Sequence, residues 1–173
     1  LNTAASACAN AIHWEHALML LNFKRDVSRH FSTLQPDVFT YNTVLSACEK
    51  GQQWERAVQL LWEMDGIYLK PDTISFNAAV AACGAVWEMA LDLVHQMENC
   101  KLQLDAVTYH SAIDACQQSQ QWEAALALCS QMTLRRIQRD VISFSLAIRS
   151  QEKAQRWKQA LDLFYNLSIL QLQ

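Results

Sequence analysis

A repeated pattern of about 35 residues constrains the fold of this 173-residue chain more than any other feature. A tryptophan followed three residues later by alanine occurs five times, at Trp14, Trp54, Trp87, Trp122 and Trp157. Successive tryptophans are separated by 40, 33, 35 and 35 residues. A unit of this length cannot bury its own apolar face, so consecutive units must stack on one another. The period therefore predicts a solenoid.

A second aromatic series has the same period. It consists of Tyr41, Phe76, Tyr109 and Phe144, which are separated by 35, 33 and 35 residues. After Tyr41, apolar residues recur at the third, fourth and seventh positions, which places them on one face of a helix. The chain has only 3 glycines and 2 prolines, too few for an all-β fold with a turn every ~10 residues. Each unit is therefore expected to be a pair of helices in an all-α protein.

The units form one expected array over the whole chain. Their approximate limits are residues 1–35 (partial), 36–70, 71–103, 104–138 and 139–173. Because the first unit begins inside an expected helix, we expect the chain to be a piece of a longer protein. Charged residues or glutamine interrupt every apolar stretch before the ~18 residues that a membrane-spanning helix needs, so no membrane insertion is expected.

One segment of the array carries a family resemblance. Residues 36–48, Pro-Asp-Val-Phe-Thr-Tyr-Asn-Thr-Val-Leu-Ser-Ala-Cys, resemble the pentatricopeptide repeat family, and residues 71–77 are similar. The resemblance implies a right-handed α-solenoid whose first helices line a concave face. It also implies binding of single-stranded RNA in mitochondria or plastids, at about one base per repeat.

In this family, a residue of the first helix and a residue at the end of the same repeat read the base. The resemblance implies that the residues on the first helices are Asn2, Asn42, Asn77, His110 and Ser145. Their partners are Asp37, Asp72, Asp105 and Asp140, and the partner of Ser145 follows residue 173. The family associates the pairing of asparagine with aspartate with uracil, which implies uracil at Asn42/Asp72 and Asn77/Asp105. Asn2/Asp37 has the same pairing, but the connection between these two residues is longer than in the other pairs. His110/Asp140 departs from the common pairings and is assigned no base.

Apolar residues stand three positions before the base-reading residues. They are Phe39, Ile74, Val107 and Ile142. Such side chains can hold a base between successive repeats. The alternative is ordinary packing between repeats, and the asparagines have an alternative role as structural amides bonded to the adjacent turn.

Charge argues less clearly for RNA. The positively charged candidates for phosphate contacts are Lys50, Arg149 and Lys153. They are balanced by Glu49, Asp114 and Glu152, and the chain as a whole carries a net charge of −3. An RNA-binding surface is usually basic. The second hypothesis is therefore a non-catalytic scaffold that binds the protein subunits of a large organellar assembly.

Motifs for catalysis are lacking in the sequence. It contains no glycine-rich phosphate loop, no Gly-x-Ser-x-Gly and no cluster of aspartates suited to a nuclease. His13 and His16 alone are weak evidence for a metal. The evenly spaced Cys8, Cys48, Cys83 and Cys116 are expected to be buried thiols. We therefore expect no enzyme activity, cofactor, metal or small-molecule substrate.

Overall fold

The computed structural model describes residues 14–28, 36–135 and 137. These residues form seven α-helices and no strand. The first helices of successive repeats are α3 (Val38–Lys50), α5 (Thr73–Ala82) and α7 (Ala106–Gln118). The second helices are α2 (Trp14–Ser28), α4 (Trp54–Gly66), α6 (Trp87–Asn99) and α8 (Trp122–Leu134). The predicted tryptophans thus mark the starts of the second helices.

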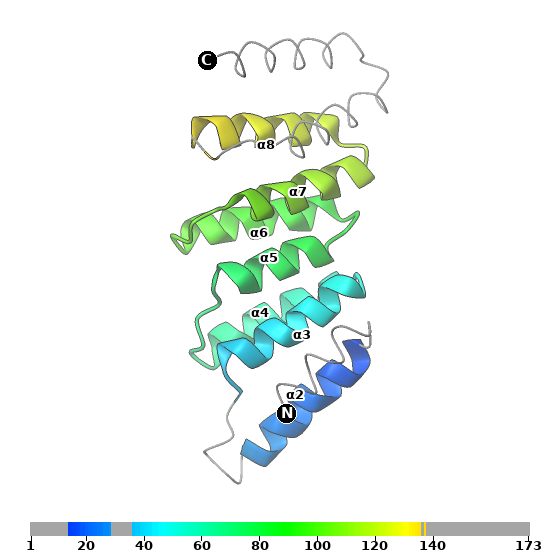
Figure 1. The fold of residues 1–173 in the computed structure, drawn as a ribbon, viewed down its shortest axis with the longest axis vertical. Coiled ribbons are helices and arrows are strands. Elements are labelled where there is room, and N and C mark those ends of the chain that lie inside the picture. The colour runs from blue at the N-terminus through cyan, green and yellow to red at the C-terminus, as the bar shows by residue number, and fades with distance from the viewer. Residues whose placement is uncertain (1–13, 29–35, 136, 138–173) are drawn as a thin grey trace.

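The helices stack in chain order along the long axis of the molecule (Figure 1). α3 packs against α5 and α5 against α7, while α4 and α6 each contact the first helices on both sides of them. Figure 1 shows α4 and α6 behind the row formed by α3, α5 and α7, which we call the first-helix row. This arrangement confirms the predicted all-α solenoid. The limits assigned to the five units remain predictions.

The apolar stripe predicted for the first full repeat lies in the core. Tyr41, Val44, Leu45 and Cys48 have no solvent exposure. Asp37 precedes α3 with an extended backbone, and its carboxylate accepts a hydrogen bond from the Thr40 N–H at 2.9 Å. This satisfies one of the N–H groups left unpaired at the start of a helix. Asp37 is thus the N-cap of α3.

Several turns use left-handed backbone, most of them at residues other than glycine. Between the helices of a repeat, Gln52, Gly84 and Gln120 have φ values of 51°, 50° and 60°. After the second helices, Tyr68 and Lys101 have φ values of 59° and 57°. A side chain in this conformation crowds the following carbonyl. Most of these turns therefore form at a local energetic cost.

The predicted row of thiols is confirmed where the structure describes it. Cys48, Cys83 and Cys116 are free and buried, and burial raises the pKa of these thiols to about 11, 12 and 11. Such thiols are inert at neutral pH, because the thiolate is the reactive form. Cys8 lies outside the described residues. Within the described residues, no helix is both long and apolar enough to cross a membrane.

Candidate nucleic-acid interface

The start of α5 is built around Asp72. Its carboxylate oxygen Oδ1 accepts hydrogen bonds from the Ser75 N–H at 2.8 Å and from the Ser75 hydroxyl at 2.9 Å. The Ser75 hydroxyl oxygen in turn accepts a bond from the Asp72 N–H at 3.2 Å, which completes a capping box. The aspartate at the repeat boundary is therefore held by the helix that it starts.

Asn42 reaches the same carboxylate from α3, the preceding first helix. Its Nδ2 donates to Asp72 Oδ1 at 3.1 Å and to Oδ2 at 3.3 Å. The Ser75 hydroxyl donates to Asn42 Oδ1 at 2.5 Å. Two residues implied as base readers, 30 positions apart in the sequence, are thus in direct contact.

Hydrogen bonding determines the charge state of Asp72. Partial burial raises its pKa, but bonds from the Ser75 N–H, the Ser75 hydroxyl and the Asn42 amide outweigh that effect. The net result is a pKa below the ordinary value of 3.8. The carboxylate is therefore a full negative charge and a pure acceptor at neutral pH.

The same arrangement recurs one repeat later. Asn77 Nδ2 donates to the two carboxylate oxygens of Asp105 at 3.2 and 3.3 Å. The Thr108 hydroxyl donates its single proton to the nearer acceptor, Asn77 Oδ1, at 2.6 Å, and its oxygen lies 2.9 Å from Asp105 Oδ1. We call each set of asparagine, aspartate and hydroxyl residue a reader triad: Asn42, Asp72 and Ser75 form one, and Asn77, Asp105 and Thr108 form the other.

The junction between α2 and α3 has a different polar environment. Lys24, only 8% exposed, donates from Nζ to the Thr40 hydroxyl oxygen at 2.8 Å, and its Nζ lies 4.0 Å from Asp37 Oδ1. The hydrogen bond from the Thr40 hydroxyl is the largest influence on the pKa of Asp37; it outweighs burial, and together with the nearby Lys24 it lowers the pKa. An ammonium group thus lies beside this aspartate.

The apolar residues implied as base contacts are exposed. Phe39, Ile74 and Val107 occupy the second position of α3, α5 and α7, with exposed fractions of 60%, 65% and 56%. Phe39 precedes Asn42 by three residues on the same helix, which places both on one face. Side chains that packed between repeats would be buried, so the exposure argues against the packing alternative.

Other predicted site residues are only partly described. His110 is half-buried on α7, and Lys50 is exposed at the end of α3. Beside Lys50, burial raises the pKa of Glu49. The remaining candidates lie outside the described residues: Asn2, Asp140, Ile142, Ser145, Arg149 and Lys153.

Two features of the site were not predicted. The hydroxyls of Ser75 and Thr108 belong to a periodic series immediately before the aromatic residues, where Thr40 is the earlier member. That periodic series was the sequence signal from which the two hydroxyl residues could have been found. Lys24 stands ten residues after Trp14, where the other described repeats have Met64, Met97 and Met132, all fully buried. Periodicity alone therefore indicated that Lys24 occupies a core position.

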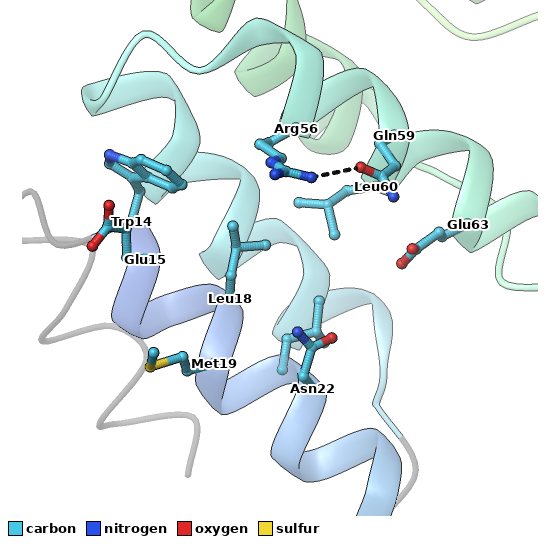
Figure 2. Close-up of a pocket in the computed structure, with 10 residues that line it drawn as sticks. Trp14, Glu15, Leu18, Met19, Asn22, Arg56, Gln59, Leu60 and Glu63 are labelled. Atoms are coloured by element: carbon cyan, nitrogen blue, oxygen red, sulfur yellow. Dashed lines mark hydrogen bonds between the residues drawn. The ribbon is translucent and has the colours of Figure 1, made fainter.

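A separate hollow of about 360 Å³ lies between α2 and α4 (Figure 2). It is lined by second-helix residues that include Leu18, Asn22, Arg56 and Glu63, and Arg56 donates to Gln59 at 3.2 Å across its edge. It contains none of the reader-triad residues. In the described part of the chain, no group of three or more His, Cys, Asp or Glu side chains could hold a metal ion.

Several solved structures have the same fold as this chain. The PPR domain of Arabidopsis thaliana protein-only RNase P 1, in complex with tRNA, is 17% identical with a TM-score of 0.76, over 97% of this chain and 87% of that one. Maize PPR10 is 20% identical with a TM-score of 0.68, over 98% of this chain and 29% of that one. PPR10 in complex with an 18-nt psaJ RNA element is 22% identical with a TM-score of 0.68, over 96% and 29%. The chain thus spans less than a third of the PPR10 chains.

Sequence comparison identifies the repeats themselves. No curated protein sequence matches the chain at a significant level. Residues 36–85 match the model of the PPR repeat family, and residues 107–137 match that of the PPR repeat. These matches contain both reader triads except Asp105, which lies between the two matched segments. The chain is therefore built, over these residues, from repeats of the pentatricopeptide repeat family.

Proposed function

We propose that this protein binds single-stranded RNA along the first-helix row and reads bases with its two reader triads. The observation that carries the proposal is the repetition of one polar arrangement at successive repeats. In each case an asparagine on one first helix and the aspartate that caps the next first helix meet beside exposed apolar side chains. A surface that serves only packing has no need to repeat such a set of polar groups beside exposed apolar groups.

The triads suit uracil. A side-chain amide has two N–H donors and two carbonyl lone pairs. In each triad the aspartate takes one donor and the hydroxyl takes one lone pair. One N–H donor and one lone pair of the carbonyl oxygen remain on each asparagine; the carbonyl oxygen can accept from the N3–H of uracil, and the N–H can donate to a carbonyl oxygen. We therefore propose a preference for uridine at these two repeats.

The exposed apolar residues supply the stacking surfaces. A base read at Asn42 would lie between Phe39 of the same repeat and Ile74 of the next, and a base read at Asn77 between Ile74 and Val107. Contacts of this kind are sequence-tolerant, since every base has two flat faces. The similar structures with tRNA and with an 18-nt RNA element show that proteins of this fold bind RNA, which supports the proposal.

Charge supports a second candidate function. The described part of the first-helix row carries Glu49, Asp114 and the capping aspartates against the exposed Lys50. RNA affinity depends strongly on lysine and arginine. A scaffold that binds protein subunits of a large assembly fits this surface, and the family resemblance points to an organelle as its location.

The decisive test is titration of the full chain with fluorescein-labelled oligouridine, oligocytidine, oligoadenosine and oligodeoxyuridine at two salt concentrations. We expect oligouridine to bind most tightly and its affinity to fall as salt rises. The double variant Asn42→Ala/Asn77→Ala should lower oligouridine affinity by about tenfold or more, since each site loses at least one hydrogen bond of ~1 kcal/mol.

Asn22→Ala provides a matched control, because Asn22 is exposed on the second helix α2. It should leave affinity unchanged. Equal losses in both variants, or no binding to any oligonucleotide by the full chain, would refute RNA reading by the triads. In the second case, co-purification of a defined protein partner would support the scaffold.

A further inference from the structure

We propose that Ser75 and Thr108 are positioning residues that fix the orientation of the reading amides and so separate uracil from cytosine. This inference rests on the proposed RNA-binding function and names the source of its specificity. It concerns two residues that touch the asparagines and need not touch the base.

The hydroxyls connect the two halves of each triad. The Ser75 oxygen lies 2.5 Å from Asn42 Oδ1 and 2.9 Å from Asp72 Oδ1, while Asn42 Nδ2 lies 3.1 Å from the same Asp72 oxygen. The three side chains therefore form a ring of close polar contacts, in which the single hydroxyl proton is donated to the nearer acceptor, Asn42 Oδ1, and the amide nitrogen donates to the carboxylate. Thr108 completes an equivalent ring with Asn77 and Asp105, with distances of 2.6, 2.9 and 3.2 Å.

The ring gives the amide a fixed direction. A free asparagine can rotate its amide by 180° and exchange its oxygen with its nitrogen at almost no steric cost. In each ring, the carboxylate accepts from the nitrogen and the hydroxyl donates to the oxygen. Rotation would place the amide oxygen against a carboxylate, where two acceptors repel, and would break the bond from the hydroxyl. Both partners therefore favour the same orientation.

That direction determines which pyrimidine fits. Uracil has a donor at N3 and an acceptor at O4, whereas cytosine has an acceptor at N3 and a donor at N4. A base held between two apolar side chains presents this edge at a fixed place. When N3 faces the amide oxygen, uracil can pair and cytosine cannot. An amide free to rotate would accept either base, so the hydroxyl contributes discrimination and not simply affinity.

Both hydroxyl residues are fully buried. Burial keeps water from replacing the bond to the amide oxygen and holds the hydroxyl in one place. Serine and threonine occupy the same position in the two triads, so the arrangement requires the hydroxyl group and tolerates an extra methyl group. Exchange of one for the other is therefore a conservative control.

The experiment compares two double variants of the full chain. Ser75→Ala/Thr108→Ala removes both hydroxyls, and Ser75→Thr/Thr108→Ser retains them. The first measurement is the ratio of the dissociation constants for oligocytidine and oligouridine. We expect this ratio to fall by about fivefold or more in the alanine variant, which corresponds to one ordinary hydrogen bond. The exchange variant should keep it within about twofold, less than half of that interaction on the same scale.

The second measurement needs no RNA. Side-chain amide resonances of Asn42 and Asn77 in ¹⁵N-labelled protein report how strongly each amide is held. We expect their heteronuclear NOE values to fall in the alanine variant and to stay high in the exchange variant. A general loss of stability would weaken the binding of oligocytidine and of oligouridine together, without changing the ratio of their dissociation constants.

Two results would overturn the proposal. One is an unchanged cytidine-to-uridine ratio in a folded alanine variant, and the other is unchanged order of both amides. If the wild-type chain binds no RNA, the proposed function fails and the inference about base discrimination fails with it. The amide measurement then still decides whether the hydroxyls position the asparagines.

Discussion

Replacement of Asp72 separates its role in the helix from its role in the reader triad. Its carboxylate accepts from the Ser75 N–H, the Ser75 hydroxyl and the Asn42 amide. Alanine removes all three contacts, and loss of an N-cap alone costs about 1 kcal/mol. Together with the lost bonds to a charged group, we expect Asp72→Ala to lower the free energy of unfolding by roughly 1–2 kcal/mol.

Asparagine at the same position keeps the cap. It is as good an N-cap as aspartate, so Asp72→Asn should cost only a few tenths of a kcal/mol. The negative charge that holds the Asn42 amide in one direction is lost, however. We therefore expect nearly wild-type stability and a cytidine-to-uridine ratio lowered by about fivefold, the value of one hydrogen bond.

Thermal denaturation and oligonucleotide titration check both expectations. For a chain of this size, each kcal/mol lowers the Tm by about 2–4 °C. The folded pKa of Asp72 lies below 3.8, so its stabilisation is complete well above that value and is lost as pH falls through the folded pKa. The stability gap between wild type and Asp72→Ala should therefore shrink below pH 3.8. A loss of stability in Asp72→Asn equal to that in Asp72→Ala would refute the separation of roles.

Three further predictions concern the stability of the helical array and the protection of its thiols. A Cβ on Gly51 would lie 2.6 Å from Trp14 Cδ1, so Gly51→Ala should lower the free energy of unfolding by about 1–3 kcal/mol. A Cβ on Gly66 would meet nothing within 4 Å, so Gly66→Ala should raise the free energy of unfolding by up to ~1 kcal/mol. Urea denaturation measures both changes. Tyr68 is 96% exposed with a φ of 59°, so Tyr68→Gly should raise the Tm by relieving left-handed strain of about 1 kcal/mol, and a lower Tm would contradict this. Iodoacetamide at pH 8, followed by peptide mass mapping, should label the exposed Cys100 well before it labels the buried thiols; equal rates would show that burial does not protect Cys48, Cys83 and Cys116.

The sequence predicted the helices through their strongest periodic signals. Four described second helices begin at tryptophans of the repeated series, from Trp14 to Trp122. Asp37 stands just before the amphipathic stripe of α3, and a carboxylate at such a place is a local signal for a helix start because it can bond free N–H groups. These signals are local, so a single sequence is enough to reveal them.

The contacts between repeats were harder to predict. That Asn42 meets Asp72 depends on how two units stack, and only the family resemblance implied the pairing. Ser75 sits among residues that cap the helix, and nothing local in the sequence shows that its hydroxyl also reaches Asn42. Lys24 was missed because lysine is rarely buried, although its register placed it in the core.

Photo-crosslinking tests the central claim most directly. The full chain would be irradiated with oligouridine that carries 4-thiouridine, and the crosslinked residues would be identified by mass spectrometry. The account predicts crosslinks at the starts of α3, α5 and α7, on or beside Phe39, Ile74 and Val107, and their loss in Asn42→Ala/Asn77→Ala. Crosslinks confined to the second helices, or crosslinks in the first-helix row that persist unchanged in this variant, would contradict it.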